Sequence, residues 1–418
     1  MLASTRAALS SFVAGETASG SVGLDGMDSR FSRGVILAVL GFGQIVAWGG
    51  TFYLPAVLAE PIARGTGWDL SWVVGGLSAG MLVSGLVSPS VGALVERHGG
   101  RPVLAGSSAV LAFGLVLLAA ARWLGVYMLG WIVLGIGMGA GLYDPAFAAL
   151  GRLYGKEART AITALTLIAG FASTLCWPFS AWVLHLAGWR ATCLAYAALN
   201  LGVALPLYWF ILPREERRAL PAPRPASTTE ARPARSRAAL FAMVALVLTL
   251  ASIIWSAVSV NLLTLLRGLG LPAHTAVALG AALGPSQVGA RLLELFMARL
   301  VAPAWEMVVS TLLVAAGLYL LSASPGVAAA GVVLYGAGTG LRSILRGTLP
   351  LALFGAEGYA LLMGRLAFPV LVAQSAAPSL AAILLDRVGA MGLEMALFWA
   401  AVANVGLAAL LLPMVARR

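Results

Sequence analysis

The chain has 418 residues, 60% of them hydrophobic and only 10% charged, and its mean hydropathy is +0.93. Soluble domains carry roughly 25% charged residues, so this composition excludes a soluble globular enzyme and indicates a protein embedded in a membrane. The formal net charge of +11 would fit binding to nucleic acid only if the basic residues formed one surface patch.

Residues 1–33 are polar, rich in Gly and Ser, and contain no apolar segment adequate for a signal peptide. We predict a disordered tail there. Beyond it, apolar runs of about twenty residues, the length that crosses a bilayer, recur to the end of the chain. The sequence therefore predicts an all-α membrane protein with twelve transmembrane helices, at residues 34–58, 71–95, 102–121, 126–150, 161–186, 191–212, 238–264, 274–298, 305–323, 328–350, 364–385 and 391–413.

A short charged turn separates the second and third predicted spans, where residues 92–104 read Gly-Ala-Leu-Val-Glu-Arg-His-Gly-Gly-Arg-Pro-Val-Leu. It resembles the loop between helices 2 and 3 of the major facilitator superfamily, whose pattern is G-x-L-x-D-R-x-G-R-[RK]-x-x-L. Glu96 replaces the Asp, and Gly100 stands where the first of two paired Arg would be. A Gly lets two membrane helices approach closely, and a carboxylate and a guanidinium at the membrane boundary can pair across moving helix ends. The resemblance assigns this conformational motif to Gly92, Leu94, Glu96, Arg97, Gly99, Arg101 and Leu104.

The segment 213–237 divides the spans six and six, because its five prolines, seven arginines and three glutamates cannot form a packed element. Pro178 and Gly188 in the first half correspond to Pro378 and Gly389 in the second. A repeat of about 200 residues predicts two pseudo-symmetric six-helix bundles, and the superfamily resemblance implies alternating access by rocking of these bundles. The predicted parts are an N-terminal tail (1–33), two bundles (34–212 and 238–413), a linker (213–237) and a C-terminal tail (414–418).

Most of the 27 Lys and Arg residues lie on the side of the N-terminal tail and the linker. The positive-inside rule then predicts a multi-pass protein of the cell inner (plasma) membrane, with both termini and the linker in the cytoplasm. Because the basic excess is a topology signal, the expected partners are membrane lipid and a small-molecule substrate rather than nucleic acid, and we expect a monomer. Five basic residues fall on the opposite side: Arg64, Arg122, Arg190, Arg267 and Arg387.

Ionisable residues inside spans indicate a functional site, because each costs several kcal/mol unless it faces a cavity or a partner. Residues 187–190 (Ala-Gly-Trp-Arg) resemble the monocarboxylate-transporter and oxalate/formate-antiporter branch, although Gly-Trp-Arg also occurs in other branches. In that branch an Arg of span 8 pairs with the substrate carboxylate, and the resemblance implies this role for Arg291. Alternatively, Glu294 neutralises Arg291 within the helix, or Arg291 lies in the cytoplasmic interface.

Three further ionisable residues occupy predicted spans 4 and 10. Arg342 and Arg346 are four residues apart and share one helix face. They either form an anion-attracting wall of the central cavity, or snorkel to phosphates and cap an inward gate. Asp144 either carries a proton or pairs with a basic residue as a gate between the halves. We predict proton coupling or gating for Asp144 and Glu294.

Polar and aromatic side chains within spans are candidates to line a pocket, since aromatic rings shape sites for planar solutes. The alternative for aromatic residues is the interfacial belt or helix packing, and we expect the belt for Trp72, Trp123, Trp305 and Trp399. Besides the three arginines, the predicted substrate-binding residues are Gln44, Trp48, Tyr143, Trp255, Gln287 and Gln374, with Tyr53 as a further candidate.

The sequence contains no phosphate-cradling loop, no metal-ligand spacing and no nucleophile beside a base. We therefore predict no enzyme activity, no metal and no cofactor, and transport driven by a gradient rather than by ATP. Span 5 reads Trp-Pro-Phe-Ser at 177–180, which lacks the G-P-x-x-G-G pattern of proton-driven drug exporters. In span 4, Trp131 stands where many superfamily members carry an Arg. These departures favour uptake or exchange of a small solute.

The sequence thus predicts a secondary active transporter of a small organic anion, a monocarboxylate, by proton symport or anion exchange. One alternative is a transporter of a neutral or aromatic solute, such as riboflavin or a drug, with the arginines confined to gates. Another is a superfamily-like receptor that binds its ligand without transporting it.

Overall fold

The computed structural model describes residues 31–216, 234–297, 300–323 and 325–416, and within these ranges the chain is helical with no β-strand. The first half contains α2 (Arg33–Gly49), α3 (Leu54–Thr66), α4 (Leu70–His98), α5 (Gly100–Ala120), α6 (Leu124–Gly141), α7 (Tyr143–Tyr154), η1 (Gly155–Glu157), α8 (Ala158–Ala169), α9 (Ala172–Leu199), η2 (Asn200–Ala204) and α10 (Leu205–Ile211). The second half contains α11 (Ala234–Gly268), α12 (Ala273–Met297), α13 (Pro303–Ala323), η3 (Pro325–Val327), α14 (Ala328–Phe354) and α15 (Tyr359–Ala416).

These helices form twelve membrane spans in the described part of the chain. Eight continuous helical stretches are long and apolar enough to cross a membrane; one of them, Leu124–Ile211, contains three spans, and another, Tyr359–Val415, contains two. The remaining span is α12, which is less apolar and is not among those eight. The all-α fold predicted from the sequence is confirmed.

Two glycines mark the same turn in both halves. Gly188, with φ 81°, separates the fifth and sixth spans inside α9, and Gly389, with φ 73°, separates the last two spans inside α15. This left-handed conformation favours Gly because it has no Cβ, so each glycine reverses the chain direction without a longer loop. The recurrence of this turn at equivalent positions fits the internal repeat seen in the sequence.

The first span differs from its predicted form. The sequence predicts one helix at 34–58, whereas the structure continues to Thr66 and interrupts the helix between Gly49 and Leu54. Pro55 lies in the first turn of α3 and cannot donate a backbone hydrogen bond to the preceding turn. The predicted span therefore ended too early and missed the break.

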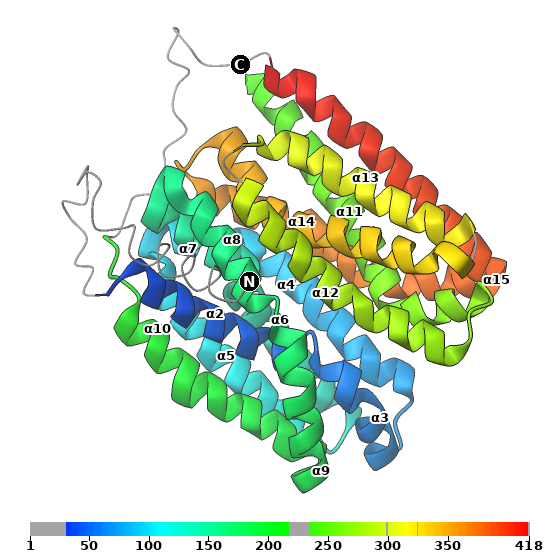
Figure 1. Ribbon diagram of the computed structural model, residues 1–418. Helices are drawn as coiled ribbons and strands as arrows, with labels where there is room; N and C mark the ends of the chain where they lie inside the picture. Colours follow the sequence, from blue (N-terminus) through cyan, green and yellow to red (C-terminus); the bar gives the residue numbers. More distant parts are fainter. Residues whose placement is uncertain (1–30, 217–233, 298–299, 324, 417–418) are drawn as a thin grey trace, which may run out of the picture.

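The two halves pack closely at one end of the molecule (Figure 1). We call this end, where α2 begins at Arg33 and α10 leads to the linker, the linker side; the end that carries the turns at Gly188 and Gly389 is the far side. A Cβ added to Gly92 of α4 would stand 2.5 Å from the carbonyl oxygen of Ala360 and 3.0 Å from the Cα of Gly364, both in α15. The halves therefore meet backbone to backbone, and the linker side is closed.

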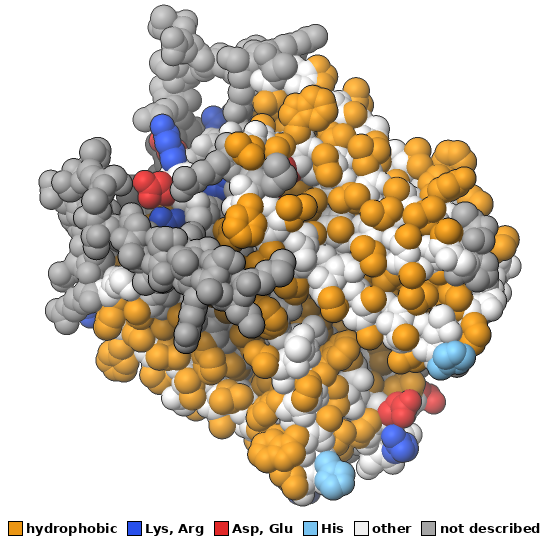
Figure 2. Space-filling view, viewed as in Figure 1, with side chains coloured by type: hydrophobic (Ala, Val, Ile, Leu, Met, Phe, Trp, Pro, Cys, Tyr) orange, Lys and Arg blue, Asp and Glu red, His pale blue; other side chains and the backbone are white. Residues whose placement is uncertain are grey.

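The outer surface has the character of a membrane protein. The face in Figure 2 is largely apolar, and its charged side chains lie towards the margins. The four tryptophans expected in the interfacial belt are all exposed: Trp72, Trp123, Trp305 and Trp399 are between 56% and 69% accessible. Exposed indole rings suit the boundary between lipid and water, where one edge can hydrogen-bond and the other stays apolar.

Candidate functional site

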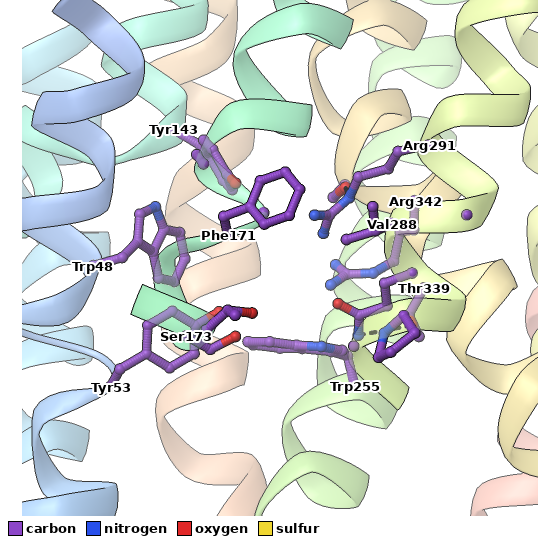
Figure 3. Close-up of a pocket in the computed structure, with 18 of the residues that line it drawn as sticks. Trp48, Tyr53, Tyr143, Phe171, Ser173, Trp255, Val288, Arg291, Thr339 and Arg342 are labelled. Carbon is purple, nitrogen blue, oxygen red and sulfur yellow. Dashed lines mark hydrogen bonds between the residues drawn. The ribbon is translucent and has the colours of Figure 1, made fainter. Parts of the chain in front are cut away.

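A cavity of about 500 Å³ lies between the two halves. Its first-half wall is aromatic and carries Trp48, Tyr53, Tyr143 and Phe171, whereas Arg291 and Arg342 project from the second half on the opposite side (Figure 3). The cavity therefore combines a flat apolar surface with a cationic one.

The aromatic wall is held together by ring contacts. The Trp48 ring centroid lies 5.1 Å from that of Tyr143 and 6.0 Å from that of Tyr53. Phe52 stacks on Trp255 at 5.2 Å, so this contact joins α11 to the first span across the two halves. Such ring pairs stabilise their arrangement beyond the area they bury, and they fix the cavity's shape.

Gln44 does not line the cavity, although it was predicted to bind substrate. It is fully buried; its amide Nε2 donates to the carbonyl oxygen of Gly141 at 2.6 Å, and its Oε1 accepts from the Trp48 indole nitrogen at 3.3 Å. Because Gly141 precedes the break between α6 and α7, Gln44 ties the first span to the fourth and orients Trp48. It is a positioning residue.

Arg291 and Arg342 are buried cations that form no ion pair with a carboxylate of the described residues. Arg291 donates from Nε to the Ser343 hydroxyl at 3.0 Å and from Nη1 to the carbonyl oxygen of Thr166 at 3.4 Å. Arg342 donates from Nη1 to the Ser252 hydroxyl at 3.3 Å and lies 5.4 Å from the centre of the Trp255 ring, while its Nε has no partner. Their exposed fractions are only 6% and 8%.

Arg346 also borders the cavity, but Asp144 compensates its charge. Its Nε donates to one Asp144 carboxylate oxygen at 2.8 Å and its Nη2 to the other at 2.6 Å. This bidentate pair links α7 of the first half to α14 of the second, on the linker side of the cavity. A pair between the halves is the arrangement that the gate interpretation of Asp144 requires, and the gate role stays a prediction.

A second ionic contact between the halves involves Arg159 of α8. Its Nη2 lies 2.6 Å from Glu306 of α13 and 3.5 Å from Glu294 of α12. The structure therefore pairs Glu294 with Arg159 and shows no ion pair between Glu294 and Arg291, so the sequence-based alternative of an intrahelical pair was wrong. The reason is that Arg291 turns towards Ser343 and the cavity.

Sequence comparison identifies the family. A profile of the Major Facilitator Superfamily matches residues 40–304, which is more than half of the chain. The protein belongs to the major facilitator superfamily. It is a multi-pass membrane protein with a transporter fold, and members of this family generally are not enzymes. No curated protein matches the chain.

Solved structures of several superfamily transporters share the fold. The human organic anion transporter MFSD10 (TETRAN) has a TM-score of 0.72 at 16% identity, covering 91% of this chain and all (100%) of that one. FucP in the outward conformation has a TM-score of 0.71 at 12% identity, covering 91% and 99%. The proton:xylose symporter XylE bound to 6-bromo-6-deoxy-D-glucose has a TM-score of 0.66 at 13% identity, covering 89% and 94%. At these identities the likeness shows the fold alone.

The superfamily motif at residues 92–104 spans the end of α4, the turn at Gly99 and the start of α5. Gly99 adopts φ 84° there, which explains the need for Gly at this position. Arg152 donates to the backbone carbonyl of Glu96, and Glu215 accepts from both Arg152 and the Gly100 amide. The Glu96 carboxylate forms no ion pair in the described part of the chain, contrary to the expected carboxylate–guanidinium pair. Arg97 is exposed, and Arg101 packs over the ring of Trp209.

The structure brings eight of the nine predicted substrate-binding residues to the cavity, all except Gln44. Gln287 donates to the Thr339 hydroxyl at 3.3 Å, and Gln374 lies on the second-half side with its backbone carbonyl bonded to Ser256. Sequence reasoning missed several lining residues because small polar side chains within spans give no distinct signal. The missed small polar residues include Ser173, Thr174, Thr339 and Ser343, and the aromatic Phe171 was missed as well.

Proposed function

We propose that this protein transports a small organic anion, a monocarboxylate, by alternating access. The observation that carries the proposal is the pair of buried guanidiniums, Arg291 and Arg342, that border the cavity without a carboxylate partner among the described residues. A charge held away from water costs several kcal/mol unless an opposite charge compensates it. A bound anion would supply that charge.

The residues of the cavity suit the two ends of such a substrate. A guanidinium presents parallel N–H groups that match the two oxygens of a carboxylate, so Arg291 would bind the head group and Arg342 would add a second positive charge. The rings of Trp48, Tyr143 and Trp255 would contact the apolar body. A human organic anion transporter among the structures of the same fold is consistent with this substrate class.

The closed linker side supports alternating access. The Asp144–Arg346 pair and the contacts of Arg159 would break when the halves rock apart on that side, and would re-form on return. By the positive-inside rule this side faces the cytoplasm, and the protein resides in the inner or plasma membrane. Coupling is proton symport or anion exchange; FucP and XylE, which share the fold, are proton symporters of fucose and xylose.

The alternative substrate is a neutral or aromatic solute, and the aromatic wall favours it. In that case Arg291, Arg342 and Arg346 would act only in gating and would not bind the substrate. Of these three arginines, however, Arg346 has a carboxylate partner across the halves, whereas Arg291 and Arg342 have none in the described residues. The anion is therefore the better match to the cavity.

A thermal-stability screen of the detergent-purified protein against carboxylates, flavins, sugars and cationic drugs tests this proposal. A ligand at a hundredfold excess over its Kd adds about 2.7 kcal/mol of stability. We expect carboxylates to stabilise the wild type and the control Arg365→Gln, whose side chain is exposed. Arg291→Gln and Arg342→Gln should lose this stabilisation. Stabilisation by neutral or cationic aromatic compounds alone would refute the anion proposal, and stabilisation without flux in vesicles would identify a receptor.

A further inference from the structure

A cluster of three ionisable side chains joins the halves on the linker side, outside the residues that line the cavity. Arg159 of α8 contacts Glu306 of α13 at 2.6 Å and Glu294 of α12 at 3.5 Å. The Glu294 side chain is 1% exposed and that of Glu306 is 8% exposed. The cluster therefore holds two buried carboxylates against one guanidinium, whose side chain is 21% exposed.

Among the described residues, the charges of this cluster do not balance. Three other ion pairs on the linker side each join one carboxylate to one guanidinium: Arg33–Glu157, Arg152–Glu215 and Asp144–Arg346. With both carboxylates ionised, the Arg159 cluster has one negative charge in excess. Both oxygens of Glu294 and one oxygen of Glu306 also lack a hydrogen-bond partner. An uncompensated buried carboxylate is strongly unfavourable, so the closed arrangement needs one more positive charge.

We propose that this cluster binds one proton, held on Glu294, when the linker side is closed, and releases it when that side opens. Glu306 lies in the first turn of α13, where the helix dipole favours a negative charge, and it has the shorter contact with Arg159. Glu294 has the longer contact and is the more buried of the two. The buried hydroxyl of Thr163 on α8, which has no hydrogen-bond partner, lies beside Glu294.

Opening of the linker side provides the release step. Arg159 belongs to the first half, and Glu294 and Glu306 belong to the second, so separation of the halves exposes both carboxylates to water. A hydrated carboxylate no longer needs compensation, and the proton leaves to the linker side. A proton that reaches Glu294 from the far side would thus be carried to the linker side once in each transport cycle.

The proton site also lies near the proposed anion site, and this part of the inference rests on the proposed function. Glu294 is three residues after Arg291 on α12, about 4.5 Å along the helix axis. The positive charge of Arg291 disfavours a proton on Glu294, and a bound anion would neutralise that charge. Anion and proton would therefore bind cooperatively, each favouring the other by the same factor.

The test follows the closure of the linker side with pH and needs no substrate. Spin labels at Lys156→Cys and Ala352→Cys, both exposed positions on opposite halves, report the distance between the halves by pulsed electron resonance, with Cys176 and Cys193 replaced by Ala. If the closed state holds one extra proton, its ratio to the open state rises by up to tenfold for each unit of pH decrease. We expect this rise as the pH is lowered across the range in which the protein stays folded.

Glu294→Gln and Glu306→Gln should each remain closed across this range, because either change leaves one carboxylate with one guanidinium. Glu394→Gln is the matched control, since Glu394 is a buried glutamate of the same half in α15, and it should keep the wild-type pH response. A wild type whose distances do not change with pH would overturn the proposal. A pH response that persists in both Glu294→Gln and Glu306→Gln would also overturn it, as would a pH response that disappears in Glu96→Gln instead. Loss of carboxylate binding without loss of the pH response would refute the proposed substrate and leave the proton site standing.

Discussion

The Asp144–Arg346 pair should hold the linker side closed, and Asp144→Asn is the direct perturbation. The two side chains are only 12% and 13% exposed and meet through two short hydrogen bonds. In the closed state the substitution leaves the Arg346 charge buried and unpaired, whereas in the open state water hydrates it. Removing one partner of a buried pair costs about 3 kcal/mol, which corresponds to a roughly 100-fold shift from the closed towards the open state.

The spin-label distance between residues 156 and 352 measures this shift. Asp144→Asn should populate the longer distance, and the double variant Asp144→Asn/Arg346→Gln should recover much of the shorter one, because no charge is then left unpaired. Glu215→Gln is the control: it breaks a more deeply buried pair, between Glu215 at the start of the linker and Arg152 of the first half, and should lower the melting temperature without opening the gate. A closed population in Asp144→Asn equal to that of the wild type would refute the gate.

Three further predictions follow from the packing and the charges. Gly92→Ala should lower the closed population in the same distance measurement, because the added Cβ would stand 2.5 Å from the Ala360 carbonyl oxygen. Gly106→Ala is the control and should leave the closed population unchanged, because a Cβ at that position meets nothing within 4 Å. Gln44→Ala removes the acceptor of the Trp48 indole and should weaken ligand binding by roughly threefold to tenfold in thermal-shift titrations, given about 1 kcal/mol for a hydrogen bond; unchanged affinity would contradict the positioning role. Carboxylate affinity, titrated at several pH values, should rise by up to tenfold for each unit of pH decrease, and a flat profile would contradict cooperative binding.

Sequence patterns predicted the spans well because the signals for them are local. Apolar length and the glycines at 188 and 389 specify helices and turns within a few residues of themselves. The breaks at 50–53 and at Leu142 escaped prediction because hydropathy does not change there. The gate partners also escaped, since Asp144 and Arg346 are 202 residues apart and hydropathy does not reveal how each helix is rotated.

The arginines of α14 show the limit of arguments from a helix face. A spacing of four residues correctly placed Arg342 and Arg346 on one side of the helix, and both border the cavity. Their chemistry differs because Asp144 compensates Arg346, whereas Arg342 meets only the Ser252 hydroxyl and the Trp255 ring. A shared face therefore predicts location, but the partner on the facing helix decides whether a charge is available to a ligand.

The same reasoning connects the cavity to the Arg159 cluster. The described residues leave an excess of positive charge at Arg291 and Arg342 in the cavity and an excess of negative charge at Glu294 in the cluster, with Arg291 and Glu294 one turn apart on α12. If these two residues simply paired, neither site would have a charge to offer. Their separation, with Arg291 directed to the cavity and Glu294 to Arg159, leaves one site that needs an anion and another that needs a proton. A monocarboxylate and a proton taken up together would compensate Arg291 and Glu294 with no net charge transferred.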